Sequence, residues 1–308
     1  MSTVALGASG TTASRVVLGL MRIKELSDAE VRTLVGTARD VGVTMFDHAD
    51  IYGGPHGCEQ RYGDAQPVPA AERDQIMIQS KVGIRPGYFD FSREHIVSSV
   101  EQSLAALRTE YLDVLLLHRP DTLMEPDEVA AAFEDLHAAG KVSSFGVSNF
   151  TPGQIELLSQ SVRQPLVANQ LQFSLAHAQL VAQGLAANIM GLEQSGDRDL
   201  GILDYSRLKK MTIQTWGSLQ KPSPGGVFIG DRERYAELND VLDELAQTHN
   251  STPTAIALAW IARHPAEMQI VIGTTTPARV QEAADAMSVT LSRQEWYRLF
   301  TAAGHTLP

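Results

Sequence analysis

The sequence predicts an α/β fold, a (β/α)8 or TIM barrel with an N-terminal β-hairpin and an additional C-terminal helix. Short apolar or β-branched runs alternate with amphipathic stretches of helical period from one end of the chain to the other. These runs form about eight strand–helix units, the number that a closed (β/α)8 barrel contains. The length of 308 residues fits one such barrel of about 250 residues with additions, so we expect a single domain spanning residues 1–308.

The first half of the chain contains the hairpin and the first four predicted strands. Residues 4–14 have the pattern of a hairpin, and the short GASG run within them indicates a turn, because a dinucleotide-binding fingerprint needs a preceding strand and a longer glycine pattern. We expect strands at 15–20, 43–46, 76–80 and 112–117, and helices after Ser27-Asp28, after Ser92 and at 126–139. Serine is a common N-cap, and Gly140 is suited to end the third of these helices.

The second half of the chain continues the same alternation. We expect strands at 143–147, 166–172, 211–216 and 268–273, and helices from Thr151-Pro152, at 231–249, from Thr252-Pro253 to about residue 263, at 277–287 and at 292–301. Proline suits the first turn of a helix, which supports three of these starts. Residues 176–210 form a long connection with an irregular pattern. An open doubly wound sheet is the competing arrangement for such alternation.

Composition and charge exclude several classes of function. The formal net charge of −11 and the pI of about 5.3 argue against nucleic acid or an anionic membrane as a partner, so any bound phosphate must be held by local groups. No apolar run approaches the roughly 18–20 residues of a membrane span, and the N-terminus lacks the order of a signal peptide. Cys58 is the only cysteine, so we expect no intrachain disulfide and no cysteine metal cluster. We expect a cytoplasmic enzyme and take a monomer as the simplest assembly.

Polar side chains follow the apolar runs of most predicted strands. In a (β/α)8 barrel the active site lies at the carboxyl ends of the strands, so these side chains are expected to meet on one rim. Each has an ordinary structural explanation when it is taken alone, such as a helix cap, a buried histidine or a solvated arginine. Their joint appearance at successive strand ends indicates an active site. They are Asp47, Ser80-Lys81, His118-Arg119, Ser148-Asn149, Asn169-Gln170, Trp216 and the segment 273–279.

Three of these residues, Asp47, Lys81 and His118, make chemical sense together with Tyr52 as an acid–base site. A tyrosine has an ordinary pKa of about 10, and a nearby Lys81 ammonium is expected to favour the phenolate of Tyr52 and lower that pKa. Asp47 is expected to hold Lys81 charged and in place, while His118 is placed to hydrogen-bond the phenol or a substrate oxygen. Such a tyrosine is suited to protonating a carbonyl oxygen as it becomes an alkoxide.

The acid–histidine–acid run at residues 47–50 also suggests a metal site. A metal-dependent barrel hydrolase could use Asp47, His48 and His118, but the chain lacks the H-x-H spacing and the carboxylate-rich eighth strand that such enzymes carry. We therefore expect no metal, and we interpret His48 and Asp50 as residues that support the loop carrying Tyr52.

Reduction of a carbonyl group needs a hydride, which no side chain supplies, so a nicotinamide cofactor is implied. Trp216 has a flat apolar face for the nicotinamide ring. The segment GTTTPAR at 273–279 has hydroxyl groups and backbone amides at a helix N-terminus, which is a natural phosphate site, and Arg279 is suited to a 2′-phosphate. The hydrogen-bonding groups that a carboxamide requires come from Ser148, Asn149 and Gln170.

Six segments together carry a resemblance to a known family. They are FDHADIYGG (46–54), QSKVG (79–83), LDVLLLHRPD (112–121), GKVSSFGVSNF (140–150), NQLQFS (169–174) and GTTTPARVQEA (273–283). In this order and spacing, and over nearly the full length, the chain resembles the aldo-keto reductases, (β/α)8 oxidoreductases that use NADPH. The HRPD motif and the tryptophan at the seventh strand are most similar to the bacterial oxidoreductase branch.

The resemblance implies reduction of aldehydes or ketones to alcohols with NADPH. Tyr52 would be the general acid, and Asp47, Lys81 and His118 would complete the tetrad. Gly273 stands where many members have a lysine and Ala283 where an asparagine is frequent, so NADH is the alternative cofactor. The cofactor-binding residues implied by the resemblance are Ser148, Asn149, Gln170, Trp216, Gly217, Ser218, Leu219, Gly273, Thr274, Thr275, Arg279 and Glu282.

Two other functions stay open at this point. A class I aldolase would form a Schiff base on Lys81, although that function leaves Tyr52 and Trp216 without a role. A regulatory protein could bind NADPH on the same fold with little or no turnover. For an enzyme, the substrate is a small aldehyde or ketone whose identity the sequence does not give. We expect its binding wall to come from residues 119–126, residues 217–230 and the C-terminal tail.

Overall fold

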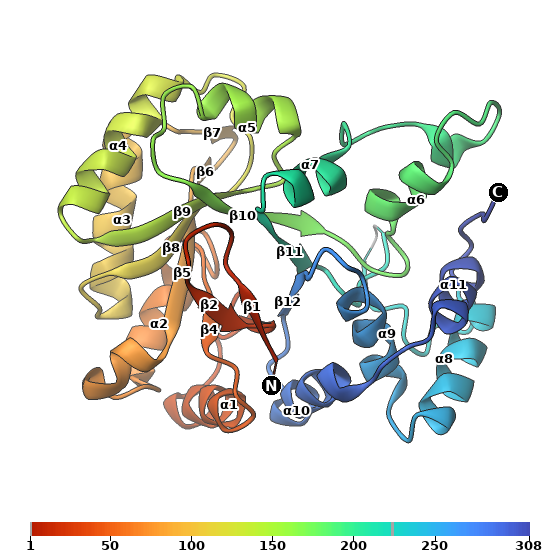
Figure 1. Cartoon of the computed structure of the whole chain (residues 1–308). Helices are drawn as coiled ribbons and strands as arrows, with labels where there is room; N and C mark the ends of the chain where they lie inside the picture. The colour runs from red at the N-terminus through yellow and green to blue at the C-terminus, as the bar shows by residue number, and fades with distance from the viewer. Residues whose placement is uncertain (1, 223–224) are drawn as a thin grey trace.

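The centre of the protein is a closed barrel of eight parallel strands, seen in a computed structural model that describes residues 2–222 and 225–308 (Figure 1). The strands pair in chain order, and the last pairs with the first through Ile272 and Leu18. They are β3 (Val16–Gly19), β4 (Met45–Asp47), β5 (Met77–Val82), β8 (Leu112–Leu117), β9 (Val142–Ser148), β10 (Leu166–Gln172), β11 (Thr212–Trp216) and β12 (Gln269–Ile272). The predicted fold class is confirmed.

Helices cover the outside of this barrel (Figure 1). Ser27 and Ser92 cap two of them as predicted, because each side chain accepts a hydrogen bond from the backbone N–H three residues on. The covering helices are α1 (Asp28–Asp40), α2 (Gly57–Ala65), α3 (Arg93–Leu107), α4 (Pro126–Ala138), α5 (Pro152–Leu158), α7 (Ile202–Leu208), α9 (Pro253–Ala262) and α10 (Pro277–Asp285). Within the described residues, no helix is long and apolar enough to cross a membrane.

The predicted additions at both ends of the chain are also present. Strands β1 (Thr3–Ala5) and β2 (Thr12–Ser14) pair in antiparallel fashion, and the turn between them reaches the start of β11, where Gly7 N donates to Thr212 Oγ1 at 2.7 Å. The hairpin therefore lies across the amino ends of the barrel strands, opposite the end where an active site is expected. Helix α11 (Arg293–Ala302) packs against α8 (Ala236–Thr248).

Helix α2 is an element that the sequence pattern did not indicate. Two of its nine residues are glycines, and its first turn follows His56, which has a left-handed φ of 51° and provides no side-chain cap. Glycine is a poor helix former, and such a start lacks the usual N-cap signal. The helix is stabilised by packing, since Cys58 and Tyr62 are buried against the barrel and α3.

Two connections also differ from their predicted form. The irregular connection at 176–210 contains α6 (Gln179–Leu185), a 3₁₀ turn η2 (Glu193–Ser195) and α7. The helix predicted from residue 231 begins only at Ala236, because the Asp231 side chain accepts hydrogen bonds from two backbone N–H groups that follow it and forms a turn. The smaller elements are η1 (Ala70–Gln75), β6 (Ile84–Arg85), β7 (Tyr88–Phe89) and η3 (Ala286–Ser288).

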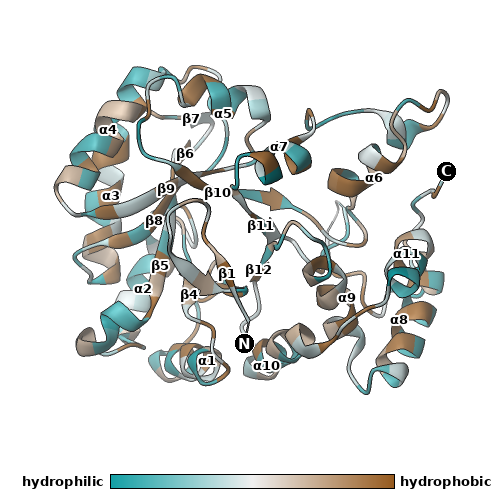
Figure 2. Ribbon diagram, in the orientation of Figure 1, coloured by the Kyte–Doolittle hydropathy of each residue, from teal (hydrophilic) through white to brown (hydrophobic). Residues whose placement is uncertain are grey.

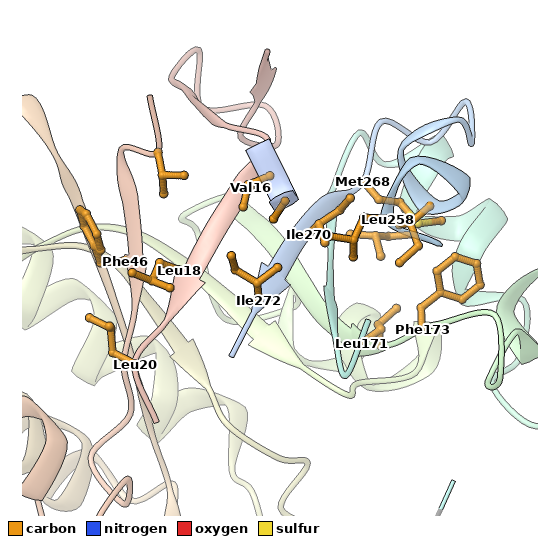
Figure 3. Close-up of a cluster of buried hydrophobic side chains, with 14 of the residues drawn as sticks. Val16, Leu18, Leu20, Phe46, Leu171, Phe173, Leu258, Met268, Ile270 and Ile272 are labelled. Carbon is orange, nitrogen blue, oxygen red and sulfur yellow. The ribbon is translucent and has the colours of Figure 1, made fainter. Parts of the chain in front are cut away.

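The hydrophobic core has two layers, inside the barrel and between barrel and helices. Side chains alternate along each strand, so Val16 and Leu18 of β3 belong to the large outer cluster, while Val17 lies in a second cluster. Figure 3 shows the outer cluster where β3 and β12 meet, with Ile270 and Ile272 beside these residues. In Figure 2 the strands are largely apolar and the outer helix faces polar, which fits a sheet covered by helices.

We expect two glycine-to-alanine changes to have opposite effects on stability. A Cβ atom at Gly63 in α2 would overlap with the carbonyl oxygen of Ala106 in α3, so Gly63→Ala should destabilise the fold by about 1–3 kcal/mol. A Cβ atom at Gly36 in α1 would meet no atom within 4 Å, so Gly36→Ala should stabilise by about 0.5–1 kcal/mol. Denaturant unfolding of the two variants measures both effects, and a Gly63→Ala variant as stable as the parent would contradict the close α2–α3 packing.

Candidate active site

The carboxyl ends of the barrel strands surround a cavity of about 540 Å³. Residues at or directly after the carboxyl ends of β3, β4, β8, β9, β10, β11 and β12 all contribute to its wall. Of the expected catalytic and cofactor-binding residues, those lining the cavity are Asp47, Tyr52, His118, Ser148, Asn149, Gln170, Trp216, Gly217, Ser218, Leu219, Gly273, Thr274 and Arg279.

Three of the expected catalytic and cofactor-binding residues do not line the cavity. Lys81 is completely buried beneath its floor. Glu282 lies on a neighbouring face of α10, because Arg279 and Ala283, four residues apart, occupy the face that the cavity contacts. Thr275 lies in the loop between β12 and α10, outside the lining.

The Lys81 ammonium is the centre of the hydrogen-bond network. Its Nζ atom donates to Asp47 Oδ2 at 2.7 Å, to the His48 carbonyl oxygen at 2.8 Å and to Tyr52 Oη at 3.1 Å. An ammonium group has three protons, and all three have partners here. Burial opposes its charge, but the Asp47 carboxylate and the Tyr52 phenol together hold the pKa of Lys81 above its ordinary value. The pairing of β4 with β5 brings the two strand ends together.

Tyr52 lies on the loop after β4 with its hydroxyl group directed at Lys81. The loop is fixed near this residue, since Cys58 N donates to the Tyr52 carbonyl oxygen at 2.8 Å. Burial raises the pKa of the phenol, and the Lys81 ammonium offsets this only in part. The predicted net lowering of the pKa is therefore wrong, because desolvation outweighs the neighbouring charge. The tyrosine is a protonated phenol at neutral pH, which is the form that can donate a proton.

His118 packs against Tyr52 by ring contact. The two ring centroids are 5.6 Å apart, with an angle of 81° between the planes. The structure records no hydrogen bond between these side chains, so the expected bond to the phenol is absent from the described part of the chain, while the side chain still faces the cavity. Burial and the charges of Lys81 and Arg119 lower the pKa of His118 to about 2, so the imidazole is neutral.

A layer of glutamine side chains lies inside the barrel beneath the site. Gln79 Nε2 and Gln170 Nε2 both donate to Asp47 Oδ1, at 2.5 Å and 3.1 Å. Gln214 exchanges two hydrogen bonds with Gln79, at 2.9 Å and 3.0 Å, and donates a third to Gln269 at 3.0 Å. Because amide groups can both donate and accept, the layer satisfies its own polar groups and orients the second carboxylate oxygen.

Trp216 is held rigidly at the cavity wall by a chain of side chains. Its Nε1 atom donates to Asn149 Oδ1 at 3.0 Å, Asn149 Nδ2 donates to Ser148 Oγ at 2.7 Å, and Ser148 Oγ donates to the Gln170 carbonyl oxygen at 3.0 Å. Asn149 has a left-handed φ of 63°, which asparagine tolerates better than most residues. The Arg119 guanidinium lies 5.6 Å from the centre of the indole ring system.

The start of α10 forms another part of the cavity wall. Thr274 Oγ1 accepts a hydrogen bond from Thr276 N at 3.0 Å, and Pro277 begins the helix. Arg279 follows within the first turn and is exposed to the cavity. Backbone N–H groups at a helix start and an adjacent guanidinium favour an anionic group.

His48 and Asp50 do not converge on a common point with Asp47. The His48 ring packs edge-on against Tyr62 with centroids 4.9 Å apart, and burial lowers its pKa to about 4. Asp50 Oδ2 accepts from Ser99 Oγ at 3.0 Å. Across the described residues, no group of three or more histidine, cysteine, aspartate or glutamate side chains is arranged to hold a metal ion.

The substrate wall differs from its predicted form at the C-terminal tail. Arg119 and several residues of 217–230 line the cavity as expected, while residues 223 and 224 lie outside the described residues. No described residue after Ala283 lines the cavity. The tail is held elsewhere, because His305 Nε2 contacts the Leu175 carbonyl oxygen at 2.6 Å and its ring stacks on Phe300.

A further set of residues that line the cavity was not expected from the sequence. Arg22 could have been found, because it follows the first barrel strand just as the other site residues follow theirs. The α9 residues had no such signal, because this helix is apolar on every face. The missed side chains are Met21, Arg22, Thr254 and Leu258.

Comparison with known proteins agrees with this geometry. Residues 15–302 match the profile of the Aldo/keto reductase family, and the chain belongs to this family. It is 35% identical to the uncharacterized oxidoreductase YcsN of Bacillus subtilis, over 96% of each chain. It is 34% identical to the oxidoreductase YdhF of Escherichia coli, over 99% of each, and 34% identical to a 6-dehydroglucose reductase of Agrobacterium fabrum, over 94% of each.

Solved structures support the fold. The thermostable aldo-keto reductase Tm1743 superposes with a TM-score of 0.75 at 24% identity, covering 98% of this chain and 100% of that one. Family and relatives together establish an NAD(P)H-dependent oxidoreductase that acts on carbonyl compounds. The residues present fit a nicotinamide cofactor, because a flat indole held by Asn149 and a helix start with Arg279 lie on the wall of one cavity.

The aldolase alternative is not favoured by the same geometry. A Schiff base requires a neutral amine that a substrate carbonyl can reach. Lys81 is completely buried, donates to three acceptors and has a raised pKa. Its ammonium therefore acts as a fixed positive charge.

We expect Asp50→Asn to change how stability depends on pH. Burial raises the pKa of this carboxyl group to about 6, with the Ser99 hydrogen bond opposing the shift. A carboxyl group whose pKa is higher in the folded state loses its stabilising contribution as pH rises through that value. Between pH 4 and pH 8 the asparagine variant should therefore gain about 2–3 kcal/mol relative to the parent, at about 1.36 kcal/mol per pKa unit.

Urea unfolding of parent and variant at both pH values measures this change, with the exposed substitution Asp40→Asn as the matched control. A stability difference between parent and Asp50→Asn that is the same at pH 4 and pH 8 would show that folding does not raise the pKa of this carboxyl group.

Proposed function

We propose that the protein reduces small aldehydes or ketones to alcohols with NADPH as the preferred cofactor, and that Tyr52 is the general acid. The observation that carries this proposal is the placement of Tyr52 Oη 3.1 Å from Lys81 Nζ, with Asp47 Oδ2 2.7 Å from the same nitrogen. A protonated phenol beside a fixed ammonium faces the cavity, and this arrangement suits proton transfer to a carbonyl oxygen.

Each member of the tetrad has a distinct role in this proposal. When bound, the nicotinamide supplies a hydride to the carbonyl carbon. Tyr52 gives its phenolic proton to the substrate oxygen as negative charge develops there. Lys81 stabilises the phenolate that remains, and Asp47 keeps Lys81 charged and in position. His118 is neutral, so its imidazole can donate a hydrogen bond to the substrate oxygen without competing as an acid.

The cofactor is proposed to extend along the cavity from Trp216 to α10. Ser148, Asn149 and Gln170 would bind the carboxamide, with Trp216 against the ring. The phosphate groups and adenosine would contact Gly217, Ser218, Leu219, Gly273, Thr274, Thr275, Arg279 and Glu282. Preference for NADPH over NADH is proposed because Arg279 and the start of α10 offer positive potential in a chain of net charge −11.

The assembly and the first substrates to test follow from composition and relatives. We propose that residues 1–308 form one domain that acts as a monomer in the cytoplasm, without nucleic acid or membrane as a partner. The names of two relatives, 6-dehydroglucose reductases from Agrobacterium fabrum and Novosphingobium aromaticivorans, make sugar aldehydes suitable first probes. Aromatic aldehydes, pyridoxal, methylglyoxal and ketosteroids extend the screen.

The test is Tyr52→Phe, assayed with the best carbonyl substrate. The ring is kept and only the acidic proton is lost, so kcat should fall by about 10²–10⁴-fold. Affinity for NADPH, measured by quenching of tryptophan fluorescence, should change by less than about 2-fold, because the phenol contacts the substrate and not the phosphate groups. Tyr88→Phe, an exposed tyrosine on β7, is the matched control with unchanged activity.

A Tyr52→Phe variant that keeps most of the parental turnover would refute the mechanism. Tight NADPH binding by the parent without turnover of any carbonyl probe would instead support a regulatory NADPH-binding protein.

A further inference from the structure

We propose that Arg22 is a second cation for the 2′-phosphate of NADPH and acts together with Arg279. This inference rests on the proposed function, because it deepens the assignment of the same cavity. It concerns a residue that lies outside the tetrad and more than 250 positions before Arg279 in the chain.

Arg22 reaches the start of α10 because two barrel strands are neighbours. β12 pairs with β3, and the register sets Ile272 beside Leu18, so the loops that follow these strands lie next to each other. The Arg22 guanidinium crosses between the loops, where its Nη1 atom donates to the Gly273 carbonyl oxygen at 2.7 Å. This bond uses one of the five N–H groups of the guanidinium and leaves others for a ligand in the cavity.

The charged side chains on the cavity wall fall into two groups. Its charged side chains are Asp47, Arg22, Arg119 and Arg279. Asp47 is neutralised by Lys81, and Arg119 lies over Trp216, so both belong to the end where Tyr52 lies. Of the other two, Arg22 contacts Gly273 and Arg279 lies in the first turn of α10. In the residues that the structure describes, neither guanidinium forms an ion pair with a carboxylate.

Such a pair of arginines suits a dianionic group. Two guanidinium groups without carboxylate partners attract a phosphate monoester, and arginine matches phosphate geometry with parallel N–H donors. The net charge of −11 gives no general attraction for NADPH, so the local pair must supply it. NADH has no 2′-phosphate and therefore should not depend on either arginine to the same extent.

The glycine at position 273 gives this proposal a stringent test. A Cβ atom at Gly273 would lie 3.4 Å from Arg22 Nη1, and the Gly273 backbone is outside the left-handed region, so a side chain is tolerated there. The Arg22 guanidinium therefore lies in contact with the place where a side chain at position 273 would begin. If Arg22 is shortened, a basic side chain from position 273 can place its charge in the same place.

The experiment titrates NADPH and NADH separately into each variant, with tryptophan fluorescence as the readout and no carbonyl substrate. Arg22→Ala should weaken NADPH binding by about 10-fold, the effect of losing about 1.4 kcal/mol from a charged hydrogen bond, and NADH binding by less than about 2-fold. Arg279→Ala should show the same selectivity. Arg163→Ala removes an exposed arginine just before β10, at the opposite end of the barrel, and should change neither affinity.

Rescue tests the position of the charge. Arg22→Ala combined with Gly273→Lys should regain most of the lost NADPH affinity, whereas Arg22→Ala combined with Gly273→Ala should regain none. Unchanged NADPH affinity in Arg22→Ala, or equal losses for NADPH and NADH, would overturn the proposal. So would a lysine double variant that binds no better than the alanine double variant. Failure of the parent itself to bind NADPH would overturn the proposed function, which separates the two results.

Discussion

The buried ion pair between Lys81 and Asp47 is the interaction on which the site depends. A charged ammonium group with no exposed surface is stable only when its desolvation is offset, and here one carboxylate, one carbonyl oxygen and one phenol oxygen do so. The same three contacts fix the strand end of β4, the start of the following loop and the side chain of Tyr52. Removing either charge would leave the other buried and unpaired. The charge of Lys81 and the position of the Tyr52 side chain therefore depend on the same ion pair.

The polar network explains why this barrel interior contains amides beneath its active site. Gln79 and Gln170 donate to the carboxylate oxygen of Asp47 that Lys81 does not use, and Gln214 connects them to Gln269. A buried carboxylate whose two oxygens both accept hydrogen bonds is held in one orientation. The wall of the cavity is built in the same way, since Asn149 and Ser148 hold Trp216. Rigid support of this kind keeps reacting groups in a fixed geometry.

Much of the fold was predictable because strands and helices alternate with a clear period, and strand ends pointed to Asp47, Lys81, His118 and Trp216. Helix α2 was not predictable, because its glycines and weak apolar stripe give no helix signal and only packing on α3 stabilises it. The direction of the Tyr52 pKa shift was also not predictable from the sequence, since it depends on burial as well as on the Lys81 charge. Arg22 meets Gly273 across 251 positions, a contact that only barrel closure creates.

The most direct test of the central claim, that the Tyr52 phenol and not a histidine supplies the proton, is the pH dependence of kcat/KM for carbonyl reduction. Because burial raises the pKa of Tyr52 and lowers that of His118 to about 2, we predict a constant rate through neutral pH. The rate should decline only above about pH 10, the ordinary tyrosine range. A decline centred near pH 6–7, the range of an ordinary histidine, would contradict it.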